Sequence, residues 1–401
     1  MYAENRKHME EKTTAQAEML ANRLRKRHRH LQKWARRTDT GAFRLYDRDI
    51  PEIPLVLDIY GDAVSGALYR RPYEKDEAEE EQWLQAMTDA AARALGLQRD
   101  TVIIKRRQRQ RGQSQYEKMT DRGLIREVRE GGLLFKVNLS DYLDTGLFLD
   151  RRAMRRMVNA DSSGKRVLNL FCYTAAFSIY AASGGAASTD SVDLSNTYLS
   201  WARDNFTLNG FDTAMPRPDE FFAGADSQRK AEVSKKNFLP RSTRSFTEDK
   251  DDFCIKTPWY ANRRFDVPSV VNSSFLNSPH KLIRADAVTF LRQAADARLR
   301  WDSIIIDPPV FSNSTMARAD FDLNRDYEEL LADCLALLAP GGKVWFSANA
   351  RSFKTGAVDM EMALADRFPG IKVSDCTSQL EDEDFKGKKI PKAFMLVVCN
   401  N

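Results

Sequence analysis

Three aspartates, Asp193, Asp286 and Asp307, each come at the end of a short run of residues that predicts a β-strand. In open α/β sheets, ligands bind outside the carboxyl ends of the strands, near the point where the strand order reverses. A single aspartate at a strand end is usually an N-cap or a turn residue. Three of them on one edge of a sheet indicate instead a ligand that offers several hydrogen-bond donors.

The loop after the first strand of this series has the composition of a nucleoside site without phosphates. It reads Asn169-Leu170-Phe171-Cys172-Tyr173-Thr174-Ala175 and leads into a helix whose first backbone amides would face the ligand. Asp193 follows about 20 residues later, which is the spacing of an acid that binds ribose hydroxyls. A dinucleotide would require G-x-G-x-x-G, which is absent, whereas S-adenosylmethionine carries no phosphate. We therefore predict this cofactor, bound by Asn169, Phe171, Tyr173, Asp193, Leu194, Asp286 and Asp307.

The segment Asp307-Pro308-Pro309-Val310-Phe311 is the most specific signal in the chain. Paired prolines after an apolar strand stiffen the backbone and hold its carbonyls toward the sheet edge. There an aspartate and a carbonyl can form hydrogen bonds with the edge of a planar base. We predict catalytic roles for Asp307, Pro308 and Pro309. We further predict that Phe311 stacks on an extruded base.

Alternating strands and helices from Arg166 onward predict a parallel sheet with helices on both faces. Ser195 is expected to cap a helix over 198–208, and the last two strands are expected to close the sheet as an antiparallel hairpin. The segment 211–279 holds six of the fourteen prolines and predicts a long insertion. It is expected to be a loosely packed surface excursion, with an RNA-contacting lid as the alternative. The predicted strands are 167–171, 188–193, 281–286, 301–307, 343–349, 371–377 and 393–399.

The N-terminal part predicts a basic helix followed by a small α+β domain. Residues 13–37 carry Met19, Leu20, Leu24, Leu31 and Trp34 at helical spacing among many cations, which fits either a packing stripe under a solvated face or an RNA-contacting helix. Strands are expected within 55–69, 101–105 and 124–138, a helix over 77–95, and a hairpin turn at residues 130–132. The predicted domains are 1–40 for the helix, 41–142 for the α+β domain and 143–401 for the methyltransferase domain.

Five cations in seven residues follow one of these strands and are expected to bind RNA phosphates, with an ordinary solvated loop as the alternative. They are Lys105, Arg106, Arg107, Arg109 and Arg111.

The composition of the chain indicates which kinds of partner and site to expect. The net charge of the 401 residues is only +5, but Met1 to Arg44 hold twelve Lys and Arg against five Asp and Glu, which indicates an anionic partner. The five cysteines are scattered without a C-x-x-C pair, so neither a metal site nor disulfides are expected. Since no apolar run is long enough for a membrane span, we expect a soluble cytoplasmic protein without a membrane partner.

The motifs together resemble the RlmK family, the guanine-N7 methyltransferase part of the bifunctional 23S rRNA enzymes called RlmKL. The resemblance rests on residues 141–152 (Asp-Tyr-Leu-Asp-Thr-Gly-Leu-Phe-Leu-Asp-Arg-Arg), on 168–171, 192–195 and 307–314, and reaches back to Tyr46-Asp47 and Ala21-Asn22-Arg23-Leu24. It implies a Rossmann-like class I S-adenosylmethionine-dependent methyltransferase domain, preceded by a small RNA-engaging α+β domain and the basic helix. It also implies a 23S rRNA or large-subunit precursor substrate in the peptidyl-transferase region, and places the segment Thr145 to Arg152 beside the cofactor site.

The chain departs from the family pattern in three respects. Ala175 stands where the family has a glycine in the cofactor loop, and the insertion 211–279 is additional. The guanine-N2 methyltransferase half of the bifunctional enzymes has no counterpart, so that activity is not expected.

Methylation of guanine N7 fits the residues at hand. N7 carries a lone pair and no proton, so neither a nucleophile nor a general base is needed, and positioning of the two reactants should dominate. Asp307 is expected to stabilise the positive charge that develops on the purine.

Other activities remain as alternatives. An RlmI-like cytosine-C5 methyltransferase needs a cysteine nucleophile, but after the fifth strand the chain reads Ser347-Ala348-Asn349-Ala350. Methylation of an exocyclic amine is less favoured, because Val310 stands after the second proline, where the loops used for that reaction have an aromatic residue. The non-enzymatic alternative is an RNA-binding assembly factor whose cofactor site has decayed around Ala175.

Overall fold

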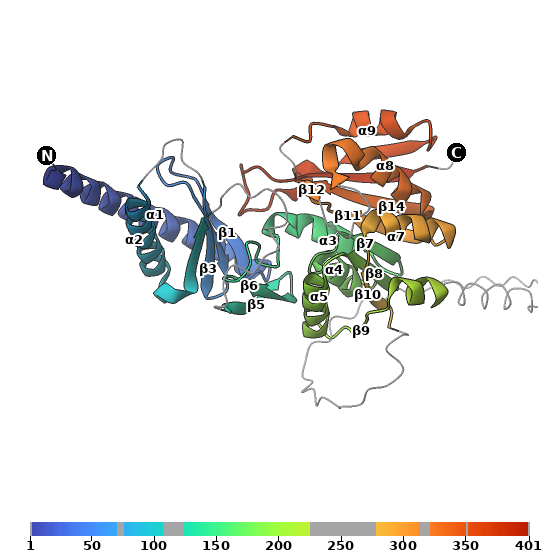
Figure 1. The fold of residues 1–401 in the computed structure, drawn as a ribbon, viewed down its shortest axis with the longest axis horizontal. Helices are drawn as coiled ribbons and strands as arrows, with labels where there is room; N and C mark the ends of the chain where they lie inside the picture. The colour runs from blue at the N-terminus through green and yellow to red at the C-terminus, as the bar shows by residue number, and fades with distance from the viewer. Residues whose placement is uncertain are drawn as a thin grey trace, which may run out of the picture.

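The computed structural model describes residues 2–69, 76–106, 123–224, 278–312, 321–349 and 352–399. A small N-terminal sheet with two helices lies beside a larger α/β body (Figure 1). The two termini lie at opposite ends of the molecule. This agrees with the predicted fold class, an α/β methyltransferase body preceded by a small α+β part and a long basic helix.

The N-terminal helix α1 spans Tyr2–Arg37 and is longer than the predicted stretch. Its stripe of Leu20, Leu24, Leu31 and Trp34 is buried as expected, whereas Met19 is 47% exposed and does not belong to the stripe. Because side chains four residues apart lie on one face of a helix, burial of Leu20 and Leu24 turns Met19 away from the core. The helix is therefore a packing element on one side and a charged surface on the other.

The N-terminal sheet has the order β1-β2-β3-β4, with β3 and β4 parallel and the other pairs antiparallel. Helices α1 and α2 pack together over one face (Figure 1). Leu45, Leu57 and Trp83 are buried in the same cluster. Asp76 caps α2 by accepting hydrogen bonds from the amides of Ala78 and Glu79. The elements are β1 (Ala42–Asp47), β2 (Leu55–Tyr60), β3 (Ala63–Leu68), α2 (Glu77–Leu95) and β4 (Val102–Arg106).

A separate hairpin, β5 (Ile125–Glu130) and β6 (Leu133–Asn138), joins the two parts of the molecule. Its turn is Gly131-Gly132, as predicted, and both glycines have positive φ angles of 60° and 83°. A Cβ atom on Gly131 would lie 2.8 Å from the Tyr180 hydroxyl oxygen, so the turn needs glycine for space as well as for conformation. Phe135 in β6 is buried in a cluster that also holds residues of the N-terminal sheet and of the larger body.

The larger body is built on an eight-stranded sheet in the order β15-β16-β14-β11-β7-β8-β10-β9. Within this sheet, the six neighbouring strands β14, β11, β7, β8, β10 and β9 run parallel to one another. Strand β16 runs antiparallel to both β14 and β15, which confirms the predicted closing hairpin. The strands are β7 (Arg166–Leu170), β8 (Ser188–Asp193), β9 (Thr213–Ala214), β10 (His280–Arg284), β11 (Trp301–Ile306), β14 (Leu338–Ala348), β15 (Ile371–Asp375) and β16 (Lys392–Val398).

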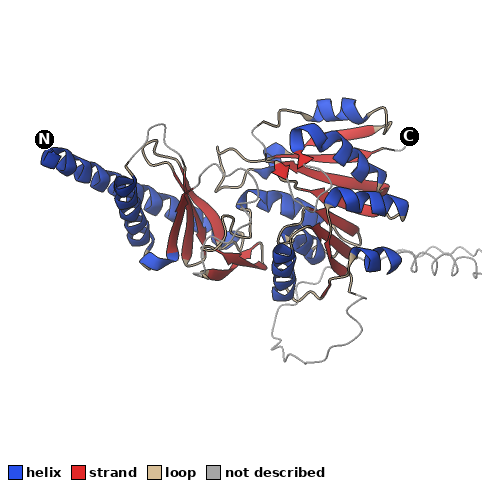
Figure 2. Ribbon diagram, viewed as in Figure 1, coloured by secondary structure: helices blue, strands red, loops and turns tan. Residues whose placement is uncertain are grey.

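Helices cover both faces of this sheet, as Figures 1 and 2 show. On one face lie α3 (Arg152–Asp161), α4 (Ala176–Ser183) and α5 (Asn196–Leu208), and on the other α7 (Ala287–Asp296), α8 (Leu323–Ala336) and α9 (Ala357–Leu364). Ser195 caps α5 by accepting a hydrogen bond from the amide of Tyr198, as predicted. Strand order reverses between β7 and β11, so their carboxyl ends form the crevice in which ligands of such sheets bind.

Two features differ from the expectations. Strand β14 begins at Leu338 rather than Lys343, because a bulge sets Trp301 opposite Leu338 and Ser303 opposite Lys343. The predicted insertion also starts too early: β9 pairs with β10, and Phe221 packs against Phe290 with ring centroids 5.6 Å apart. Residues 225–277 of that insertion lie outside the described part of the chain.

Candidate functional site

The loop between β7 and α4 has an unusual backbone. Phe171, Tyr173 and Ala175 have positive φ angles of 54°, 52° and 59°, although none is glycine. Residues other than glycine seldom adopt this conformation, and where they do so together the surrounding structure must hold them. The alternation folds the loop tightly over the carboxyl end of β7, where the strand order reverses. Ala175, which stands at the family's glycine position, adopts the glycine-like conformation.

Asp193 is bonded to this loop from the end of β8. Its carboxylate accepts hydrogen bonds from the backbone amides of Tyr173 and Ser195, both at 2.9 Å. Burial raises the pKa of Asp193 to about 6, and the backbone hydrogen bonds only partly offset that effect. Asp193 thus both shapes the loop and presents a carboxyl group at the sheet edge.

Three other predicted cofactor residues, Asn169, Leu194 and Asp286, differ in their burial and in their hydrogen-bond partners. Asn169 is buried and donates to Ser178 Oγ at 2.9 Å, which lies 2.7 Å from Ser191 Oγ, so its amide supports the loop from inside the sheet. Leu194 is half-buried next to Asp193. Asp286 caps α7 by accepting from the amide of Thr289 at 2.9 Å.

Aromatic side chains surround the loop. The Tyr173 ring lies 5.2 Å from that of Phe148 and 4.5 Å from that of Tyr198, measured between centroids. Phe171 contacts Phe321 at 5.7 Å. Such rings form an apolar wall at the loop, of the kind that packs against the face of a base or an aliphatic chain.

Asp307 directly follows β11, and both of its carboxylate oxygens are bonded to Arg151. Nε of Arg151 lies 2.9 Å from Oδ2 and Nη2 lies 2.9 Å from Oδ1 of Asp307. Nη1 of the same guanidinium lies 3.1 Å from Asp150 Oδ2. The carboxylate that is expected to stabilise the charge on the purine is therefore already part of a two-point ion pair, which neutralises much of its charge.

Exposure increases along the residues that follow Asp307. Pro308 is buried and Pro309 half-buried, whereas Val310 and Phe311 are 41% and 46% exposed. Phe311 belongs to β12 (Phe311–Ser312), which pairs with β13 (Phe321–Asp322). Since Phe321 also contacts Phe171, this small ladder joins the Asp-Pro-Pro segment to the cofactor loop. Phe311 therefore presents an exposed aromatic ring, and its role in base stacking stays a prediction.

The predicted phosphate-binding loop is only partly described, and its first two cations are engaged internally. Lys105 is buried, its ammonium donates to the backbone carbonyls of Tyr142 and Leu143, and burial lowers its pKa to about 8. This corrects the expectation that Lys105 is free to contact RNA. Arg106 forms ion pairs with Glu77 and Glu81. Arg107, Arg109 and Arg111 lie outside the described residues.

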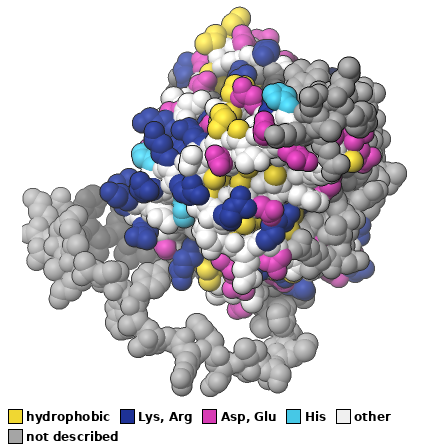
Figure 3. Space-filling model, turned by 90° about the vertical axis from the view of Figure 1, so that its left-hand side faces the viewer, with side chains coloured by type: hydrophobic (Ala, Val, Ile, Leu, Met, Phe, Trp, Pro, Cys, Tyr) yellow, Lys and Arg dark blue, Asp and Glu magenta, His cyan; other side chains and the backbone are white. Residues whose placement is uncertain are grey.

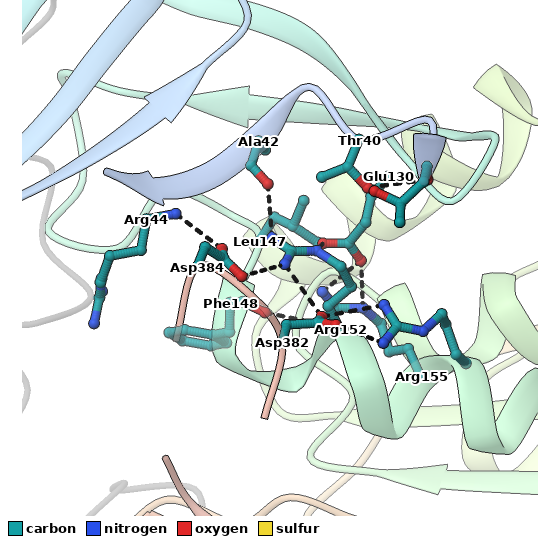
Figure 4. Close-up of polar contacts among 12 residues, drawn as sticks. Thr40, Ala42, Arg44, Glu130, Leu147, Phe148, Arg152, Arg155, Asp382 and Asp384 are labelled. Atoms are coloured by element: carbon teal, nitrogen blue, oxygen red, sulfur yellow. Dashed lines mark hydrogen bonds and ion pairs between the residues drawn. The ribbon is translucent and has the colours of Figure 1, made fainter. Parts of the chain in front are cut away.

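A buried cluster of charged side chains connects the N-terminal part to the site (Figure 4). Glu130 at the end of β5 accepts from Arg152 Nε at 3.2 Å and from Arg155 Nε at 2.8 Å. Arg152 also donates to Asp384 at 2.9 Å and to the carbonyl of Ala42 in β1 at 2.7 Å. Arg155 donates to the carbonyl of Phe148 at 2.9 Å. Helix α3 therefore holds the small sheet, the hairpin and the Phe148 segment together.

The sequence interpretation missed Arg151 and this cluster. The family resemblance placed the segment Thr145 to Arg152 beside the cofactor, and its contacts agree: Thr174 Oγ1 donates to the carbonyl of Gly146 at 2.6 Å. The only local signal was the acid–base run Asp150-Arg151-Arg152 at the start of a helix. Nothing in that run identifies Asp307 or Glu130 as the partner.

The chemistry of the site suits S-adenosylmethionine. Asp193 at the end of β8 and Asp286 shortly after β10 bring two carboxyl groups to this edge of the sheet, and the loop after β7 is tight and poor in glycine, unlike a pyrophosphate-binding loop. Within the described residues, no cluster of three or more His, Cys, Asp and Glu side chains could hold a metal ion. None of the described helices is both long and apolar enough to cross a membrane.

Comparison with known proteins agrees with this geometry. Residues 47–224 match the family model of S-adenosylmethionine-dependent methyltransferases. The solved structure most useful for the fold is a protein described as a methyltransferase and complexed with SAH, with a TM-score of 0.62, 22% identity, and coverage of 95% of this chain and 81% of that one. A methyltransferase structure from Streptococcus mutans gives a TM-score of 0.60 at 21% identity, with the same coverage.

Two curated relatives show the family. Ribosomal RNA large subunit methyltransferase K of Neisseria meningitidis is 37% identical over 374 residues, which cover 93% of this chain and 85% of the relative. Ribosomal RNA large subunit methyltransferase K/L of Pseudomonas paraeruginosa is 38% identical over 95% of this chain, which spans only 42% of that longer relative. Since the identity extends over almost the whole chain and the fold is that of a methyltransferase, the chain belongs to the ribosomal RNA large subunit methyltransferase K family of S-adenosylmethionine-dependent methyltransferases.

Proposed function

We propose that this protein methylates N7 of a guanine in 23S rRNA, within the peptidyl-transferase region, either in the free RNA or in a large-subunit precursor. The observation that carries the proposal is the identity of 37% with a methyltransferase K relative over almost the whole of both chains. The reaction would take place in the cytoplasm, where large subunits of bacterial ribosomes are assembled.

The site offers the parts that this reaction needs. Bound over the Phe171–Ala175 loop, S-adenosylmethionine would supply an electrophilic methyl group. Asp193 and Asp286 would hold the adenosine, and Tyr173 and Phe148 would pack against the methionine side. The Asp307-Pro308-Pro309 segment would present its carbonyls to the edge of the guanine while Phe311 stacks on it. Because N7 is unprotonated, alignment of the two reactants would account for most of the rate enhancement.

A second group of residues supports an RNA substrate. Arg25, Arg29 and Lys33 are exposed and four residues apart, so they line one face of α1 opposite its buried stripe. Figure 3 shows Lys and Arg side chains gathered, together with histidines, on the N-terminal end of the molecule. Cations spaced along a helix neutralise the phosphates of a nucleic-acid backbone. We therefore assign RNA contact to this face of α1, in addition to the predicted Arg107, Arg109 and Arg111.

The described cysteines do not favour the cytosine-C5 alternative. Cys172 is buried, and burial together with the neighbouring Asp193 raises the pKa of its thiol well above the ordinary value, so little thiolate forms. Ser347 occupies the end of β14. The decayed-site alternative is weakened as well, because Ala175, with a φ angle of 59°, adopts a left-handed conformation that glycine would also adopt.

The test is a methylation assay with labelled S-adenosylmethionine on unmodified 23S rRNA and on large-subunit precursor particles. We expect 7-methylguanosine as the labelled nucleoside, identified by mass spectrometry after digestion. Finding 5-methylcytidine or N2-methylguanosine instead, or no label on either substrate, would refute the assignment.

A further inference from the structure

We propose that Arg151 and Asp307, with Asp150, form a charge-balancing group that makes the site favour the cationic methyl donor over its neutral product. The proposal depends on the proposed function only in that S-adenosylmethionine is the donor. It concerns neither the RNA nor the acceptor atom.

The geometry of the group is well defined. Arg151 is buried, and its guanidinium makes the two-point contact with Asp307 and a third contact, at 3.1 Å, with Asp150. The side chains of Asp307 and Asp150 are only 14% and 23% exposed. A guanidinium remains protonated in proteins, and contact with two carboxylates at this depth stabilises its charge further. Within these three side chains, one cation and two anions leave a net charge of −1. Arg44, which also interacts with Asp150, is paired with Asp58 at 2.9 Å.

The group lies beside the cofactor loop. Asp307 follows β11, the strand next to β7, whose carboxyl end carries that loop. The segment that carries Arg151 also contacts the loop directly, through the rings of Phe148 and Tyr173 at 5.2 Å and the hydrogen bond from Thr174 to Gly146. A net negative charge is thus held at the edge where a sulfonium ion would be bound.

The donor and the product differ in charge at one atom. The sulfur of S-adenosylmethionine is positive, whereas that of S-adenosylhomocysteine is neutral, and the two molecules are otherwise nearly identical. In a partly buried site, one unit of charge at a distance of several ångströms changes affinity by about ten-fold or more. The group would therefore assist release of the product, and Arg151 acts as a positioning residue that also prevents an excess of negative charge.

The experiment measures dissociation constants of both ligands by calorimetry on the intact protein and compares their ratio between variants. Asp307→Asn makes the group neutral and should shift the ratio against S-adenosylmethionine by about ten-fold. Arg151→Gln should shift it the other way. The double variant restores a net charge of −1 and should return the ratio to that of the wild type. A structural disturbance common to both ligands cancels in the ratio.

Two further variants separate charge from orientation. Arg151→Lys keeps the charge but breaks the two-point ion pair, so the ratio should stay at the wild-type value while kcat for methylation falls. Arg156→Gln is the matched control, because Arg156 lies in α3, which begins directly after Arg151, but is exposed and pairs with Asp382 at 2.7 Å. Its ratio should not change.

Equal weakening of both ligands by Asp307→Asn would overturn the proposal, as would a double variant whose ratio stays shifted. If Arg151→Gln fails to fold, the comparison of Asp307→Asn with Arg151→Lys decides by itself. Since the binding measurements contain no RNA, failure here is distinguishable from failure of the rRNA assignment.

Discussion

At the scale of single residues, burial raises the pKa of three side chains at the cofactor loop, Cys172, Tyr173 and Asp193. Asp193 is the clearest case, because burial raises its pKa to about 6 from an ordinary value of 3.8. Folding therefore favours the protonated form of Asp193 relative to the unfolded chain. The resulting contribution to stability is complete below pH 3.8 and is lost as the pH rises through about 6.

This pKa predicts a pH dependence of cofactor binding. Only the ionised Asp193 can accept hydrogen bonds from two ribose hydroxyls, so affinity for S-adenosylmethionine should fall as the pH drops below about 6, by roughly ten-fold per unit. Calorimetry between pH 5 and pH 7.5 measures this directly. Asp193→Asn should bind weakly at every pH and show no slope in this range. An equal slope in both proteins would remove Asp193 from the cofactor site.

Lys105 shows how a residue of the right type can be wrong for its predicted role. Its position in a run of cations indicated phosphate binding, yet its ammonium is enclosed against the Tyr142 and Leu143 carbonyls. A cation whose charge is used inside the molecule contributes little to attraction of a polyanion. The prediction of RNA contact in this region therefore rests on Arg107, Arg109 and Arg111, and our proposal adds α1.

At the scale of elements, the loop between β7 and α4 carries the strain of the site. Three residues with positive φ within five positions are held by Asp193, by the Thr174–Gly146 hydrogen bond and by the aromatic wall. For a residue with a Cβ atom, this left-handed conformation is less stable than the right-handed one by about 1 kcal/mol or slightly more. The rest of the fold must offset that amount, which explains why the loop is bonded at so many points.

Substitution of Ala175 tests this account. Ala175→Gly relieves the conformational strain but adds freedom to the unfolded chain and removes a buried methyl worth about 0.8 kcal/mol. The free energy of unfolding should therefore change by less than about 1 kcal/mol, and cofactor affinity by less than about three-fold. Ala175→Val adds branching at Cβ, which this conformation does not tolerate, and should abolish cofactor binding. Denaturant unfolding measures the change in stability, and calorimetry measures the change in cofactor affinity. Tight cofactor binding by the valine variant would contradict the description of the loop as strained.

At the scale of the whole molecule, the cluster around Glu130 joins the N-terminal part to the methyltransferase body. Glu130 and Asp384 are completely buried, and together they accept from Arg152, Arg155 and the amide of Arg44. The cation of Arg152 also lies over the Trp34 ring at 5.1 Å. Helix α1 and the loops at the carboxyl edge of the large sheet are thus fixed relative to one another through α3.

Glu130→Gln should therefore destabilise the protein severely. The change leaves two buried guanidinium groups without their shared carboxylate, a loss of about 3 to 5 kcal/mol. Glu127→Gln on the same strand is the matched control, because Glu127 is exposed and its loss should change stability by less than about 0.5 kcal/mol. Urea unfolding followed by tryptophan fluorescence compares them. Similar midpoints for the two variants would show that the cluster does not stabilise the joint.

The basic face of α1 makes a separate prediction at this scale. Arg25→Gln together with Arg29→Gln should weaken RNA binding and reduce the slope of log K against log salt by about 0.7 to 0.9 for each phosphate that is no longer neutralised. The control pair is Arg292→Gln with Arg300→Gln, two exposed cations on the methyltransferase body, where Arg300 precedes the amino end of β11. Filter binding over a range of salt concentrations provides the slopes. Equal slopes for both double variants would exclude α1 from the RNA interface.

Much of the fold could be predicted from local patterns. Alternation of strands and helices determined the sheet, Ser195 and Gly131-Gly132 marked a helix start and a turn, and carboxylates at strand ends located the predicted cofactor edge. These signals are readable because period, capping and turn chemistry act over a few neighbouring residues. The cofactor class followed as well, from the absence of a glycine-rich phosphate loop.

The tertiary structure alone decided which charges meet. Arg151 and Asp307 are 156 residues apart in the chain, and Glu130 pairs with arginines that follow it by 22 and 25 positions. The same holds for Lys105, whose neighbours come from a segment beyond the next hairpin. Ion pairing has no sequence period, and a buried charge takes whichever partner the packed surfaces bring within reach. For that reason Asp307 could be recognised in the sequence as a candidate site residue, whereas its neutralisation by Arg151 became visible only in the folded molecule.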